Sequence, residues 1–131
     1  MNRSEDWLAQ GKRDIEAAES AMNNSFFEWT CFMCQQGAEK LLKALAQKNG
    51  MELWGHNISQ MLHILAEHVG SDIPNDVSDS VGILDKLYIL PRYPNGFPDG
   101  PPFKHFTKKD AEDAICSAKI LSHWCDTVGS R

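Results

Sequence analysis

The sequence has none of the features that mark a membrane or secreted protein. No apolar run approaches the roughly 18 to 20 residues that a helix needs to cross a bilayer. The first ten residues include Glu5 and Asp6, and they lack the basic start and apolar stretch of a signal peptide. We therefore expect a cytoplasmic protein that does not bind membranes.

Positive charge is also scarce. The chain of 131 residues carries 13 Lys and Arg against 18 Asp and Glu, which gives a formal net charge of −5 at pH 7. A surface that binds nucleic acid along its length needs clustered Lys and Arg to neutralise phosphates. The composition therefore excludes a broad basic surface and leaves room only for a local basic site.

Familiar catalytic and metal-binding motifs are missing as well. There is no glycine-rich phosphate loop and no legible Ser-His-Asp or Cys-His arrangement. Cys31 and Cys34 have the spacing of a redox or zinc pair, but no second pair of Cys or His lies nearby. We expect no metal or cofactor, and we expect the four cysteines to be reduced.

What the sequence does have is helical periodicity over most of its length, without a strand pattern or an internal repeat. Apolar residues at helical spacing predict five helices, over residues 4–23, 25–49, 57–69, 75–90 and from 107 onward. Expected caps are Ser4, Asn57 and Thr107 at helix starts and Gly50 and Gly70 at helix ends. The expected fold is all-α, an antiparallel up-and-down bundle of four long helices plus a shorter helix, in one domain over residues 1–131.

The fourth predicted helix has two apolar stripes. One stripe is formed by Val77, Val81, Leu84 and Tyr88, and the second by Ile83, Leu87 and Leu90. A helix with two apolar faces can bury one in the core and the other against a partner subunit. The second stripe therefore predicts a subunit interface, and it makes a purely structural adaptor one of the functions to consider.

A row of polar residues accompanies the apolar stripe of the second helix, in the run CFMCQQGAEKLLKAL. Gln36, Lys40 and Lys43 share one face, with Gln35 and Glu39 on the neighbouring stripe. One interpretation is a solvated face with a weak ion pair between Glu39 and Lys43. The other is a phosphate or nucleotide site, in which the lysines supply charge and the glutamines supply hydrogen bonds.

Five of the six prolines and two glycines fall within residues 91–106, which predicts a long irregular loop. At its start, Arg92 can bind phosphate and Tyr93 can stack on a base, or the pair can simply anchor the loop. At its end, His105 can join the same site. His56, just before the cap of the third helix, fits either a local hydrogen-bonding role or catalysis.

The runs CFMCQQGAEKLLKAL, GHNIS and LYILPRYPN, followed by an Ala-rich final helix, together resemble the HEPN domain (higher eukaryotes and prokaryotes nucleotide-binding domain). The most specific parts are the pattern F-x-x-Q-Q-x-x-E-K-x-x-K-A-L at residues 32–45, His-Asn-Ile at 56–58 and Arg-Tyr-Pro at 92–94. The resemblance covers nearly the whole chain with its motifs in order. It implies an all-α bundle that forms a homodimer and is often encoded beside a minimal nucleotidyltransferase, in a two-component system of the toxin–antitoxin type.

The resemblance also implies candidate activities. Many family members are metal-independent ribonucleases, in which an Arg followed after a short spacer by a His forms a composite site across the dimer. This chain departs from that motif, because twelve residues separate Arg92 from the next histidine, His105. We therefore expect a module that binds nucleotide or RNA phosphate, with a ribonuclease using Arg92 and His105 as one alternative and a purely structural adaptor as the other. The expected ligand-binding residues are Gln36, Lys40, Lys43, His56, Arg92 and Tyr93.

Overall fold

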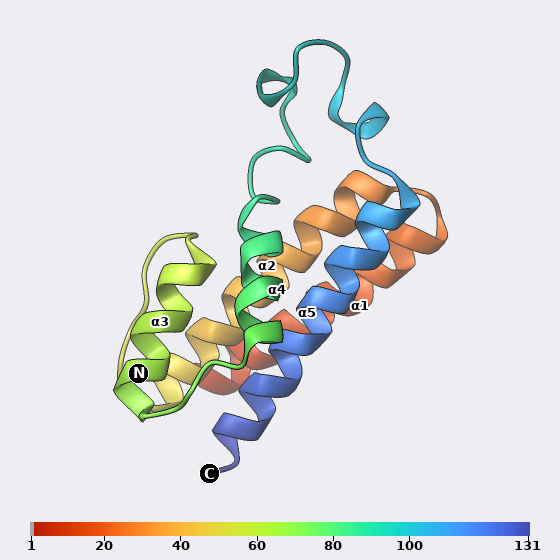
Figure 1. Cartoon of the computed structure of the whole chain (residues 1–131). Coiled ribbons are helices and arrows are strands. Elements are labelled where there is room, and N and C mark those ends of the chain that lie inside the picture. The colour runs from red at the N-terminus through yellow and green to blue at the C-terminus, as the bar shows by residue number, and fades with distance from the viewer. Residues whose placement is uncertain (1) are drawn as a thin grey trace.

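A computed structural model describes residues 2–131, which form five α-helices and no strand (Figure 1). The helices are α1 (Ser4–Asn23), α2 (Phe27–Lys48), α3 (Ile58–Val69), α4 (Asn75–Asp85) and α5 (Lys108–Gly129), and two short 3₁₀ turns, η1 (Pro94–Gly96) and η2 (Pro102–Lys104), lie in the long loop. The predicted all-α fold with five helices is confirmed. None of the helices in this described part is long and apolar enough to cross a membrane.

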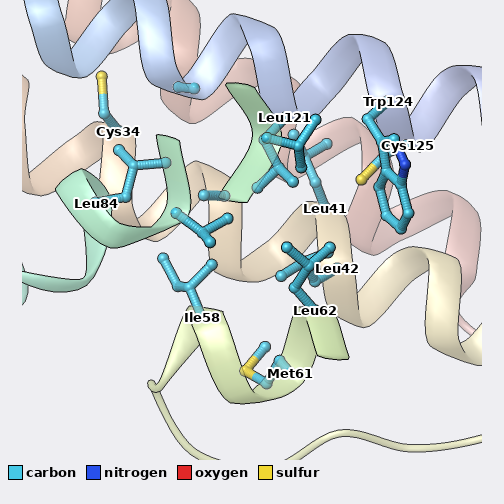
Figure 2. Close-up of a cluster of buried hydrophobic side chains, with 14 of the residues drawn as sticks. Cys34, Leu41, Leu42, Ile58, Met61, Leu62, Leu84, Leu121, Trp124 and Cys125 are labelled. Carbon is cyan, nitrogen blue, oxygen red and sulfur yellow. The ribbon is translucent and has the colours of Figure 1, made fainter. Parts of the chain in front are cut away.

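Helix α2 is the central element of the bundle, because it contacts all four of the other helices. The long helices α1, α2 and α5 lie side by side, and the shorter α3 and α4 complete the core (Figure 1). Figure 2 shows Leu41 and Leu42 of α2 together with Ile58 and Leu62 of α3 and Leu121 of α5. Burial of these apolar side chains is the main force that holds the five helices together.

Two glycines allow α1 and α2 to cross at very close range. A Cβ atom added to Gly37 would lie 2.9 Å from Cγ1 of Ile15 and 3.0 Å from the backbone oxygen of Gly11. A Cβ atom added to Gly11 would lie 3.1 Å from the backbone oxygen of Gly37. This crossing therefore depends on the absence of side chains at both positions, and it fixes where the polar row of α2 faces.

Four of the predicted helix caps are confirmed. The side chains of Asn57 and Thr107 each accept a hydrogen bond from the backbone N–H three residues further on, at the starts of α3 and α5. Gly50 and Gly70 adopt positive φ angles of 74° and 69° just beyond the ends of α2 and α3. The third helix is thus held at both ends, which fixes the residues that precede it.

The first helix spans the predicted residues, but its predicted cap was wrong, and so was the predicted start of the second helix. Ser4 does not cap α1: it already lies within the helix, and its backbone N–H donates to the side chain of Asn2 at 2.8 Å. The second helix begins at Phe27 rather than at residue 25, because Ser25 has a φ of 64° and so cannot start a right-handed helix.

The fourth helix is shorter than predicted, and it ends at Asp85 rather than near residue 90. Residues 86–92 form successive turns instead. Pro91 explains this ending, since its ring conflicts with a helical carbonyl four residues earlier and disfavours helical backbone at the residue before it. The bundle consequently has three long helices of 20, 22 and 22 residues and two short ones of 12 and 11, rather than four long and one short.

The early end of α4 also removes the predicted second apolar stripe. Leu87 has only 9% of its surface exposed and belongs to the core, whereas Ile83 is 41% exposed. Beyond Asp85 the backbone no longer follows the helical period, so Leu87 and Leu90 do not continue the face of Ile83. The predicted interface stripe is therefore wrong as a single surface, and a substitution at Leu87 would test core packing instead.

Three of the four cysteines serve as packing residues. Cys31, Cys34 and Cys125 are buried, while Cys116 is exposed. Burial raises the pKa of the Cys31 thiol to about 12, and it raises the pKa of Cys34 and Cys125 as well. Because the thiolate is the reactive form, these three thiols are inert at neutral pH and fill the core as small apolar groups.

Candidate functional site

The polar row of α2 meets the start of α3 and the end of α4 near the end of the bundle from which the long loop projects (Figure 1). We call this set of side chains the Glu39 cluster. Its members come from α2, from the segment before α3 and from the turns after α4, namely Gln35, Glu39, Lys43, His56, Tyr88 and Arg92. Three segments far apart in the sequence thus share one polar site.

Glu39 is the centre of the cluster and is only 5% exposed. Its carboxylate accepts a hydrogen bond from Nζ of Lys43 at 3.1 Å and another from Nδ1 of His56 at 2.7 Å. Lys43 is itself mostly buried, and its ammonium lies 5.6 Å from the centre of the Trp7 ring. A buried carboxylate is tolerated only when it is paired and hydrogen-bonded, and both carboxylate oxygens of Glu39 meet that condition.

His56 is fixed by contacts on its ring and on its backbone. The imidazole stacks on the Tyr88 ring, with centroids 4.1 Å apart and an angle of 18° between the planes. The backbone oxygen of His56 accepts a hydrogen bond from Gln35, whose own side-chain oxygen accepts one from Gln36. With Nδ1 donating to Glu39, Nε2 makes no hydrogen bond within residues 2–131 and is available to a ligand.

Asp85 connects the part of the site on α4 to the part that precedes α3. Its carboxylate accepts hydrogen bonds from the backbone N–H groups of Ile58 at 2.6 Å and Ser59 at 3.0 Å. A carboxylate at the first turn of a helix satisfies free N–H groups and interacts favourably with the helix dipole. Asp85 therefore holds His56 beside the segment that carries Tyr88 and Arg92.

Arg92 lies among aromatic rings rather than beside a carboxylate. Its guanidinium carbon is 4.2 Å from the ring centre of Phe32, 4.7 Å from that of Tyr88 and 5.1 Å from that of Tyr93. Nε donates to the backbone oxygen of Tyr88 at 2.8 Å. Within residues 2–131 the guanidinium has no ion pair, and its two terminal nitrogens make no hydrogen bond. They can therefore donate to an anion as a planar pair.

The structure brings together most, but not all, of the residues predicted from the sequence. Lys43, His56 and Arg92 belong to the cluster, Gln36 adjoins it through Gln35, and Tyr93 flanks Arg92. Lys40 instead forms an ion pair of 2.5 Å with Asp14 of α1.

Sequence reasoning missed three contributors to the site. The apolar periodicity places Tyr88 on a core stripe, and because Arg92 lies outside the predicted helix, helical spacing did not connect the two residues. Phe32 entered the predictions only as part of the family pattern, yet its ring is the one closest to the guanidinium. Asp85 gave no local signal, because its partners lie 26 and 27 positions earlier.

Comparison with known proteins assigns the family. A family model of the HEPN domain matches residues 4–128. This chain belongs to the HEPN family. The resemblance inferred from the sequence runs is thereby confirmed.

Solved structures resemble the whole of this HEPN domain. TT1696 from Thermus thermophilus is 37% identical with a TM-score of 0.92, and the match covers 98% of this chain and 99% of that one. ST0689, described as an archaeal HEPN homologue, is 36% identical with a TM-score of 0.81, covering 97% and 98%. The HEPN domain protein tm0613 from Thermotoga maritima is 29% identical with a TM-score of 0.77, covering 95% and 98%. Among curated proteins, none matches.

His105, the other histidine considered for this HEPN domain, is engaged within the long loop. Its Nε2 is 2.6 Å from the backbone oxygen of Asp99, and its ring stacks on Phe97 with centroids 4.2 Å apart. No hydrogen bond or ring contact joins His105 to Arg92 in the part of the chain that the structure describes. His105 therefore serves to shape the loop here, and the arrangement gives no support to catalysis by this pair.

Residues 2–131 of the HEPN domain contain no group of three or more His, Cys, Asp or Glu side chains arranged to hold a metal ion. The polar groups of the Glu39 cluster form a network of hydrogen bonds between donors and acceptors of the chain. Arg92 and His56 both lie against the Tyr88 ring, and each has a nitrogen without a protein partner among these residues. The two terminal nitrogens of the Arg92 guanidinium are donors, and they suit an anionic group.

Proposed function

We propose that this HEPN domain is a homodimeric module that binds the phosphate of a nucleotide or of RNA at the Glu39 cluster. It acts with a minimal nucleotidyltransferase partner in a two-component system of the toxin–antitoxin type. The observation that carries the ligand part is Arg92, whose guanidinium lies among aromatic rings with both terminal nitrogens unbonded in the described residues. Membership of the HEPN family supports the proposed homodimer and the proposed nucleotidyltransferase partner.

The charges of the cluster favour one anionic group rather than many. Lys43 is paired with Glu39 and Lys40 with Asp14, so Arg92 is the cation of this region without a carboxylate partner in residues 2–131. A guanidinium binds a phosphate through two parallel hydrogen bonds, and its weak hydration suits a partly buried position. His56 adds a second donor through Nε2 when its ring is protonated. Together they fit one phosphate.

Calorimetric titration with ATP, other nucleotides and a short RNA tests the ligand part. Wild type is expected to bind, and Arg92→Ala is expected to weaken binding about 10- to 100-fold because charge-assisted hydrogen bonds are lost. Arg13→Ala is the matched control, since Arg13 is exposed on α1 and pairs with the equally exposed Glu16. No binding by wild type, or equal binding by Arg92→Ala, contradicts the proposal.

Light scattering tests the assembly part of the proposal. The purified chain is expected to have twice the mass of one copy. The product of the neighbouring gene is expected to be a nucleotidyltransferase and to elute with the chain as a stable complex. A monomer at micromolar concentration argues against the dimer, and a neighbouring gene of another class argues against the two-component system.

A further inference from the structure

Arg92 is surrounded by aromatic rings, which a site for a phosphate alone does not require. Tyr93, next to the guanidinium, is 49% exposed, and Trp29, whose ring contacts Phe32, is 42% exposed. The Trp29 and Phe32 rings meet edge to face, with centroids 6.2 Å apart and planes at 75°. Arg92 therefore contacts one half-exposed ring directly, that of Tyr93, and is joined through Phe32 to a second, that of Trp29.

We propose that the ligand is a nucleotide with an unpaired base, and that Tyr93 and Trp29 form the surface on which this base stacks. This inference rests on the proposed phosphate binding by Arg92. A phosphate held at the guanidinium brings the attached base within reach of the neighbouring rings. Stacking on an aromatic side chain adds affinity for any base, because every base has a π face.

The charge of the chain argues for an unpaired rather than a duplex ligand. Duplex binding depends on many phosphate contacts from Lys and Arg, and this chain has a net charge of −5 with its nearby lysines already paired. Internal bases of a duplex also have both faces covered by neighbouring bases, so they cannot stack on Tyr93 or Trp29. A free nucleotide and a single-stranded RNA end share the chemistry that fits this surface.

The contribution of the base can be measured separately from that of the phosphate. AMP and ribose 5-phosphate carry the same phosphate, so we expect AMP to bind wild type at least about tenfold more tightly by calorimetry. Tyr93→Ala and Trp29→Ala should each reduce this ratio, and Tyr93→Phe should preserve it because the ring remains. Phe26→Ala is the control, since Phe26 is exposed but makes none of these ring contacts.

The outcomes separate this inference from the proposed function. Equal binding of AMP and ribose 5-phosphate, both lost in Arg92→Ala, overturns the stacking surface and leaves the phosphate site standing. Binding of neither ligand overturns the phosphate site itself. A short single-stranded RNA that competes with AMP supports an RNA end as the source of the nucleotide, and tighter binding of a blunt RNA duplex than of this strand overturns the inference.

Discussion

Gly37→Ala is expected to lower the free energy of unfolding by about 1 to 3 kcal/mol, although alanine is the better helix former. The new methyl group would lie 2.9 Å from Cγ1 of Ile15 and 3.0 Å from the backbone oxygen of Gly11. Ile15 is buried in the core, and the oxygen belongs to the backbone of α1, so neither can move aside without shifting a helix. The strain therefore exceeds the gain in helix propensity.

Gly82→Ala provides a matched control for this prediction. Gly82 lies inside α4, and a Cβ atom added there would meet no atom within 4 Å in residues 2–131, apart from its chain neighbours and the nearby backbone of the same helix. The same substitution should therefore increase stability, by up to about 1 kcal/mol. Urea denaturation of both variants measures the difference. If Gly37→Ala is as stable as Gly82→Ala, then α1 and α2 do not approach each other closely at Gly37.

The elements of this fold could be predicted because their signals are local. Helical periodicity and the caps at Asn57, Thr107, Gly50 and Gly70 depend on residues within one turn of each other. The errors occurred where a nearby residue overruled the pattern. The apolar spacing continues to Leu90, for example, but Pro91 ends the regular helix five residues sooner.

The site was only partly predictable because its contacts join distant segments. Helical spacing placed Gln36, Lys40 and Lys43 on one face of α2. It gave no information about which residues of the other helices contact that face. In the structure Lys43 pairs within α2, whereas Lys40 reaches Asp14, 26 positions earlier. Two lysines on one face thus have different partners, and periodicity alone cannot separate them.

Glu39→Ala is expected to lower the free energy of unfolding by about 2 to 4 kcal/mol. The substitution leaves the mostly buried ammonium of Lys43 without its partner and removes the acceptor that fixes His56. This loss of stability is expected to be smaller than for an ion pair fully enclosed in the core, because the His56 side chain that also binds Glu39 is half exposed. Urea denaturation measures it. Glu16→Ala is the control, since the exposed pair of Glu16 with Arg13 should contribute less than about 1 kcal/mol.

A double variant separates the stabilising role of Glu39 from its role in the site. Changing Glu39 to Leu and Lys43 to Met removes both charges together, and apolar side chains of similar volume often replace a buried ion pair without loss. The free energy of unfolding of the double variant should therefore lie within about 1 kcal/mol of that of wild type. Nucleotide binding should still be weaker, because the His56 ring loses the acceptor that orients it. Full recovery of both stability and binding would mean that Glu39 stabilises the bundle and takes no part in the ligand site.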